Sequence, residues 1–127
     1  MDELKTRMLQ GLRVLIVEDE HIVALALADD LEDHGAVIVG PASSVEGALE
    51  LIDKHEIEVA VLDIQLQSQM VFPVAEALTG LDVPFLFTSG FDASAVPREF
   101  AHVPQCEKPA SAQTMVDMLA RLVGKNG

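Results

Sequence analysis

The most constraining feature of the chain is the stretch of residues 59–63, Val-Ala-Val-Leu-Asp, an apolar and largely β-branched run that ends on one carboxylate. A polar loop over residues 65–70 follows it directly. A run of this length and composition predicts a strand that is buried on both faces, as in a parallel sheet. Asp63 is therefore expected at the carboxyl edge of a sheet, where open α/β proteins place their functional groups.

The rest of the chain alternates strand-like and helix-like segments. Apolar runs predict further strands over residues 12–17, 36–39, 83–87 and 102–106. Apolar residues at helical spacing predict helices over residues 21–34, from a cap at Ser43 to about residue 55, over 73–78, and after a cap at Ser111. This alternation implies an α/β fold with a five-stranded parallel sheet, right-handed crossovers and helices on both faces.

The alternation also sets the predicted domain organisation. Residues 1–11 are polar and amphipathic and are expected to be an N-terminal extension, whereas residues 12–127 are expected to form one domain. Residues 91–100 lack a clean periodicity and predict a loop or a weak helical turn. We find no repeat and no linker that would mark a second domain.

Charge and composition exclude several classes of function. The formal net charge is −13, from 21 acidic against 8 basic residues, and the chain has no Trp or Tyr. Such a surface repels phosphate backbones and offers few rings for base stacking, so we expect no binding to nucleic acid. The sequence has no apolar run long enough to cross a bilayer and no signal-peptide pattern, and its lone Cys106 fits a reducing compartment. We therefore expect a cytoplasmic protein without membrane contact.

The predicted strand ends carry polar groups of complementary chemistry. These groups are Glu18 and Asp19 after the first strand, Asp63 on the third, Ser89 after the fourth and Lys108 after the fifth. Carboxylates crowded at one edge repel each other unless a cation lies among them, and their oxygens suit Mg²⁺. With Mg²⁺ and the ammonium group neutralising phosphoryl oxygens, Asp63 could attack phosphorus in line, while the Ser89 hydroxyl could donate to a phosphoryl oxygen.

The pattern Val17-Glu18-Asp19-Glu20, Leu62-Asp63, Pro84 with Ser89, and Lys108-Pro109 resembles the receiver domain of two-component response regulators. The resemblance covers about residues 12–123 and implies a flavodoxin-like fold with strand order 2-1-3-4-5. It also implies phosphotransfer to Asp63 from a sensor histidine kinase or a histidine phosphotransfer protein, and an unidentified downstream protein. Mg²⁺ would be held by Asp19, Asp63 and the backbone carbonyl of Gln65, with Glu18 binding through water.

The segment 84–91, Pro-Phe-Leu-Phe-Thr-Ser-Gly-Phe, together with Pro73, is similar to a subgroup of stand-alone receivers, the FATGUY type. This similarity places Ser89 at the switch hydroxyl position. Thr88 stays open as the alternative, because a strand that slips by one residue would exchange the two.

Three positions depart from the family pattern. Glu18 stands where Asp is more usual, the loop after Asp63 lacks the usual proline, and Gln105 stands where an aromatic ring usually moves inward on activation. Gln105 therefore favours a different conformational response to phosphorylation, in which residues 91–100 become ordered.

Two other functions stay open. One is a pseudo-receiver that binds partners without phosphorylation, and the intact Asp19, Asp63 and Lys108 argue against it. The other is a phosphatase with an aspartyl-phosphate intermediate. Such enzymes of the haloacid dehalogenase type use a second Asp two residues after the nucleophile as acid or base, and this chain has Gln65 at that position. The leading prediction is therefore a phosphoacceptor with at most slow self-dephosphorylation, and not an enzyme with turnover.

Overall fold

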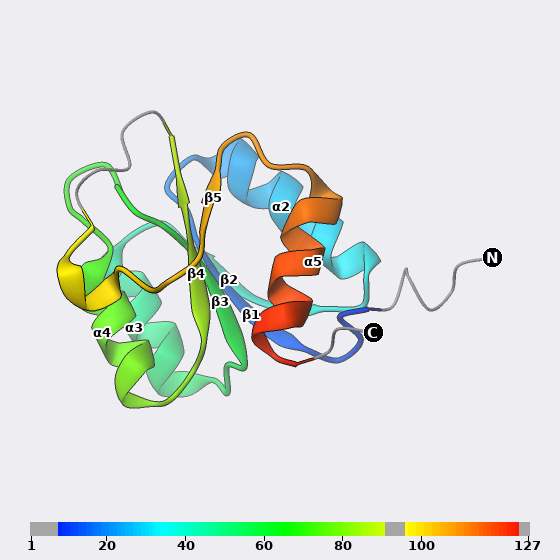
Figure 1. The fold of residues 1–127 in the computed structure, drawn as a ribbon, viewed down its shortest axis with the longest axis horizontal. Helices are drawn as coiled ribbons and strands as arrows, with labels where there is room; N and C mark the ends of the chain where they lie inside the picture. The colour runs from blue at the N-terminus through cyan, green and yellow to red at the C-terminus, as the bar shows by residue number, and fades with distance from the viewer. Residues whose placement is uncertain (1–7, 91–95, 125–127) are drawn as a thin grey trace.

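The computed structural model describes residues 8–90 and 96–124. Its five strands form one parallel sheet in the order β2-β1-β3-β4-β5, so the predicted doubly wound α/β fold and strand order are confirmed (Figure 1). The elements in chain order are β1 (Arg13–Val17), α2 (His21–Asp33), β2 (Val37–Ala42), α3 (Val45–Lys54), β3 (Val59–Asp63), α4 (Phe72–Gly80), β4 (Phe85–Ser89), the 3₁₀ helix η1 (Arg98–Phe100), β5 (Gln105–Glu107) and α5 (Ala112–Leu122).

Helices cover both faces of the sheet. α3 and α4 pack on one face and α2 and α5 on the other (Figure 1). Successive strand residues point to opposite faces, so Ala60 and Leu62 of β3 enter the core under α3 and α4, whereas Val59 and Val61 enter the core under α2 and α5. All five residues of β3 are buried, as the sequence predicts. Within the described ranges, each helix is too short or too polar to cross a bilayer.

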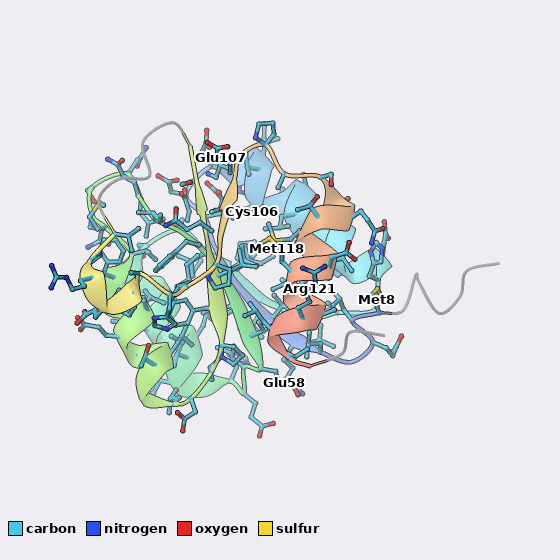
Figure 2. The ribbon with its side chains drawn as sticks, in the orientation of Figure 1. Met8, Glu58, Cys106, Glu107, Met118 and Arg121 are labelled. Carbon is cyan, nitrogen blue, oxygen red and sulfur yellow. The ribbon has the colours of Figure 1, made fainter. Side chains whose placement is uncertain are left out.

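The single cysteine packs in the core under α2 and α5. Cys106 is buried and unpaired on β5, and Met8 and Met118 pack against the same cluster (Figure 2). Burial raises the pKa of its thiol, which disfavours the reactive thiolate at neutral pH. Its position therefore agrees with a packing role.

The predicted bounds of three strands are wrong, and a proline lies at each error. The predicted strand 102–106 is shifted to Gln105–Glu107, because residues 101–103 form the turn after η1 and Pro104 has no N–H group to donate to the sheet. The predicted strand 36–39 continues through Pro41 to Ala42, because β2 lies at the sheet edge, where a missing N–H group is tolerated. The predicted strand 83–87 is shifted to Phe85–Ser89, because Pro84 cannot donate to the ladder. Both candidate switch hydroxyls, Thr88 and Ser89, therefore lie inside β4.

The predicted helix caps are partly confirmed. Ser111 caps α5, and its Oγ accepts a hydrogen bond from the Thr114 N–H. The cap of α3 is Ser44, not the predicted Ser43, and its Oγ accepts from the Gly47 N–H. The predicted weak turn after β4 is represented by η1, whereas residues 91–95 lie outside the described part of the chain.

Residues 8–11 form a turn that packs against the end of α2. Leu9 is fully buried, and its N–H donates to the His34 carbonyl at 2.9 Å. The Gly11 N–H donates to the Gly35 carbonyl at 2.8 Å. Gly35 has φ of +95°, and a Cβ at this position would lie 2.7 Å from the Gln10 Cα. Glycine is therefore required here by both backbone conformation and space.

We expect Gly35→Ala to lower the free energy of unfolding by about 2–4 kcal/mol, from left-handed backbone strain plus the close contact. Urea unfolding followed by far-ultraviolet circular dichroism measures this change. The matched control is Gly80→Ala at the end of α4, where an added Cβ would meet no atom within 4 Å. Equal stability of the two variants would contradict the close packing of residues 8–11 on Gly35.

Candidate functional site

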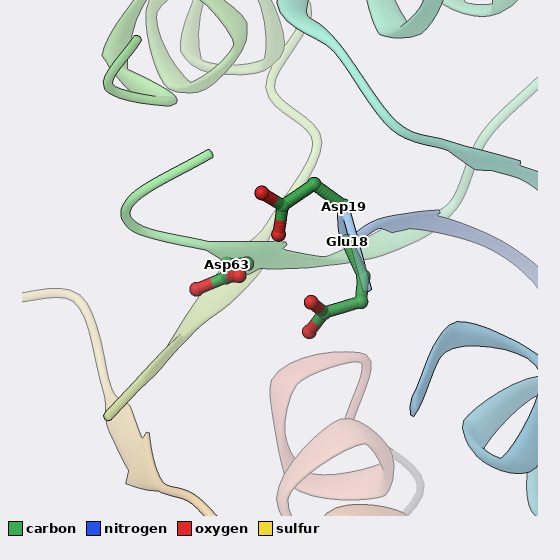
Figure 3. Close-up of side chains that lie close together, drawn as sticks. All are labelled: Glu18, Asp19 and Asp63. Atoms are coloured by element: carbon green, nitrogen blue, oxygen red, sulfur yellow. The ribbon is translucent and has the colours of Figure 1, made fainter. Parts of the chain in front are cut away.

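Asp63 ends β3 at the carboxyl edge of the sheet and is 6% exposed. Glu18 and Asp19 directly follow β1, which pairs with β3 up to Val17 opposite Leu62. The three carboxylates can each present an oxygen within 4.8 Å of the others, and Figure 3 shows them side by side. The structure thus brings together the three acids that the sequence predicts at this edge.

Lys108 reaches the same edge from the end of β5. Its Nζ lies 2.8 Å from Glu18 Oε1 and 3.1 Å from Asp63 Oδ2. Because β4 lies between β3 and β5, the lysine side chain must cross the end of β4 to reach these acids. The Lys108 backbone N–H donates to the Ser89 carbonyl at 2.8 Å, and this hydrogen bond fixes the lysine backbone beside the end of β4.

Both oxygens of Glu18 have partners inside the protein. Oε1 pairs with Lys108, and Oε2 accepts a hydrogen bond from the Glu20 N–H at 3.0 Å. Glu18 is 4% exposed, so this carboxylate is held in place in a buried position. The Glu20 carboxylate also lies 3.8 Å from Lys108 Nζ. In the sequence, Glu20 stands out only as one member of an acidic run, so this contact was not predicted.

The site shifts the pKa of two of its groups. Burial, and then repulsion from Glu18, raise the pKa of Asp63 to about 6, although the ammonium group of Lys108 acts in the opposite direction. Burial lowers the pKa of Lys108, but hydrogen bonds to Glu18 and Asp63 outweigh it, so the net shift is upward. At neutral pH the lysine is therefore charged and Asp63 is mostly ionised.

A cavity of about 450 Å³ opens at this edge, and its walls suit a hard cation. Asp19, Asp63 and Gln65 line it together with Lys108. Carboxylate and carbonyl oxygens are the ligands that Mg²⁺ prefers. Glu18 lines the neighbouring cavity between α2 and α5. This donor set fits a magnesium ion held mainly by Asp19, Asp63 and the loop of Gln65.

The two candidate switch hydroxyls lie next to each other in β4. Thr88 pairs with Asp63 in the register of the sheet, and Ser89 pairs with Glu107 of β5. Thr88 lines the cavity between α2 and α5 beside Lys108, and the alternation of the strand turns Ser89 toward the opposite face. The assignment of Ser89 as the switch hydroxyl stays a prediction.

The fold and the site together define a class of protein: a doubly wound α/β domain with a buried carboxylate, acidic neighbours and a lysine at one sheet edge. The family model described as the response regulator receiver domain matches residues 14–119, and the chain belongs to this family.

Solved structures and curated relatives agree with this family. The solution structure of SdrG from Sphingomonas melonis Fr1 is 34% identical, covers 91% of this chain and 96% of that chain, and has a TM-score of 0.74. The BeF3-activated conformation of SdrG from Pseudomonas melonis Fr1 is 37% identical over 87% of this chain and 95% of that chain, with a TM-score of 0.74.

Among curated proteins, the transcriptional regulatory protein PdtaR of Mycobacterium tuberculosis is 37% identical over 54 residues, which is 42% of this chain and 26% of PdtaR. The sensory transduction protein LytT of Bacillus anthracis is 35% identical over 88 residues, which is 67% of this chain and 36% of LytT. The chain thus spans only about a quarter to a third of the length of these relatives.

Proposed function

We propose that Asp63 accepts a phosphoryl group from a phosphohistidine of a sensor histidine kinase or a histidine phosphotransfer protein. The phosphorylated chain then signals or relays the group through contacts with a downstream protein. The observation that carries this proposal is the Lys108 ammonium, which lies 3.1 Å from the buried Asp63 carboxylate at an acidic sheet edge. Similarity to SdrG over 91% of this chain and 96% of that chain supports it, whereas membership of the FATGUY-type subgroup stays a prediction.

The proposed step is an in-line displacement at phosphorus. An ionised oxygen of Asp63 forms the new P–O bond while the P–N bond to histidine breaks, and the ring nitrogen keeps the electron pair. Lys108 offsets the negative charge of the incoming phosphoryl group, and the hydroxyl of Ser89, or alternatively Thr88, donates to one of its oxygens.

Magnesium fits the same step. Asp19, Asp63 and the Gln65 carbonyl would hold the ion, with Glu18 acting through water, because both Glu18 oxygens already have protein partners. The bound ion would neutralise phosphoryl oxygens. Gln65 also supplies no general acid or base at its position, which favours a lasting phosphoryl group over rapid turnover.

Intact mass spectrometry tests the proposal after incubation with acetyl phosphate and Mg²⁺. We expect one phosphoryl adduct that is labile to hydroxylamine and absent in Asp63→Ala. The matched control is Asp53→Asn, which removes an exposed carboxylate of α3 and should leave the adduct unchanged. An adduct that persists in Asp63→Ala would contradict the assignment. The absence of both an adduct and Mg²⁺ binding in the wild type would instead favour the pseudo-receiver.

A further inference from the structure

The loop between β3 and α4 folds back on itself as a small hairpin, defined here as residues 64–71. Gln65 and Met70 pair as an antiparallel bridge, and the Leu66 N–H donates to the Gln69 carbonyl at 2.9 Å. The Val71 N–H donates to the Ile64 carbonyl at 2.9 Å, which closes the base of the hairpin. The hairpin carries Gln65, which lines the acidic cavity beside Asp63.

One side chain ties the tip of this hairpin to a different element. Gln69 Oε1 accepts a hydrogen bond at 3.1 Å from the backbone N–H of Val45, the first residue of α3. The neighbouring cap, Ser44, accepts from Gly47 at 3.0 Å. Two N–H groups at the start of α3 are thus satisfied by side chains, one local and one from the hairpin 24 residues away.

We propose that Gln69 is a positioning residue that holds the hairpin against α3 and thereby fixes the Gln65 carbonyl for Mg²⁺. The proposal rests on the proposed function, since it concerns the metal of that site. Mg²⁺ demands a nearly ideal octahedral geometry, so a small displacement of one ligand lowers affinity. Groups that orient metal ligands typically change affinity tenfold or more when they are lost.

The role of Gln69 is separable from simple support of α3. Val45 is the first residue of the helix, and Ser44 still caps the helix without Gln69, because its Oγ accepts from the Gly47 N–H. Loss of the Gln69 acceptor should therefore leave α3 formed but free the tip of the hairpin. Loss of the Ser44 cap should do the reverse, weakening α3 while the hairpin keeps its contact.

The test compares Gln69→Met, which keeps the size of the side chain but removes the acceptor, with Ser44→Ala. We expect Gln69→Met to raise the Mg²⁺ dissociation constant about tenfold in isothermal titration calorimetry. Ser44→Ala should leave that constant unchanged while lowering the urea midpoint. In the metal-free protein, the Leu66 and Val71 amides should exchange faster in Gln69→Met than in the wild type.

Each outcome separates this proposal from the proposed function. Wild-type Mg²⁺ affinity in Gln69→Met would overturn the positioning role and leave the receiver chemistry intact. Equal weakening by Ser44→Ala would also overturn it, because α3 itself would then control the site. A wild-type protein that binds no Mg²⁺ and takes no phosphoryl adduct would overturn the proposed function as a whole.

Discussion

Replacing Asp63 with asparagine should abolish the phosphoryl adduct and also stabilise the metal-free protein at pH 8. Loss of the adduct follows because an amide cannot act as the nucleophile. The gain in stability follows from the pKa of Asp63, which rises from 3.8 to about 6 on folding, mainly through burial and then through Glu18. A shift of this size corresponds to about 3 kcal/mol of cost for carrying the folded carboxylate in its charged form.

The sign of the pH dependence follows from the same shift. Below pH 3.8 the carboxyl is protonated in both states, so Asp63 imposes no penalty on folding. Between pH 3.8 and about 6 the unfolded chain has lost this proton while the folded protein still holds it, so the stability of the folded state falls over this range and levels off above it. The difference between Asp63→Asn and the wild type should therefore be small at pH 4 and grow to about 2–3 kcal/mol at pH 8.

Urea unfolding at both pH values, followed by circular dichroism, measures this difference. Asp53→Asn is again the control and should show no such growth. Saturating Mg²⁺ should narrow the gap, because it binds the folded wild type in preference to the variant. An Asp63→Asn protein that is no more stable than the wild type at pH 8 would contradict the claim that the ionised Asp63 carboxylate destabilises the metal-free fold.

The sequence predicts this site well because parallel topology brings the strand ends together whatever the details of packing. The composition of residues 59–63 alone placed Asp63 at the sheet edge, and the alternation of elements brought Glu18, Asp19 and Lys108 to it. Strand ends were harder to predict, since Pro84 shifts the start of β4 while β2 accommodates Pro41 as an edge strand.

Contacts between distant segments had no sequence signal. The hydrogen bond from the Val45 N–H to Gln69 joins the start of α3 to the tip of a loop. Neither a valine nor a glutamine at these positions predicts such a contact. One Glu18 oxygen contacts Lys108 and the other accepts from the Glu20 N–H. These two contacts likewise require atomic positions that are correct to about an ångström, which a sequence pattern does not provide. These contacts depend on the positions of segments that are not adjacent in the fold's sequence pattern, so they became visible only in the structure.

Lys108→Met should produce the second large effect, a loss of both phosphorylation and stability. The ammonium lies 2.8 Å from Glu18 and 3.1 Å from Asp63, and both acids are buried. Its removal leaves two close carboxylates without a cation, which typically costs about 3 kcal/mol. Loss of one charge-stabilising group typically slows group transfer about 100-fold, and we expect this slowing for adduct formation from acetyl phosphate.

The pH dependence distinguishes this electrostatic loss from a simple packing defect. The folded pKa of Lys108 is raised above 10.5, so its contribution is complete at pH 8 and declines only at higher pH. In Lys108→Met, the pKa of Asp63 should rise further, so acid should protonate that carboxyl and recover much of the lost stability. Mg²⁺ should also recover stability at pH 8, because it replaces the missing positive charge.

The matched control is Lys54→Met on α3, where the pair with Glu50 spans 4.0 Å between side chains that are 65% and 70% exposed. An exposed pair of this kind contributes roughly 0.5 kcal/mol or less, so this variant should unfold like the wild type and accept the phosphoryl group at the same rate. If Lys108→Met were equally destabilised at pH 4 and pH 8, the defect would be one of packing. Only a defect that acid and Mg²⁺ both relieve identifies Lys108 as the cation that permits two acids to share this edge.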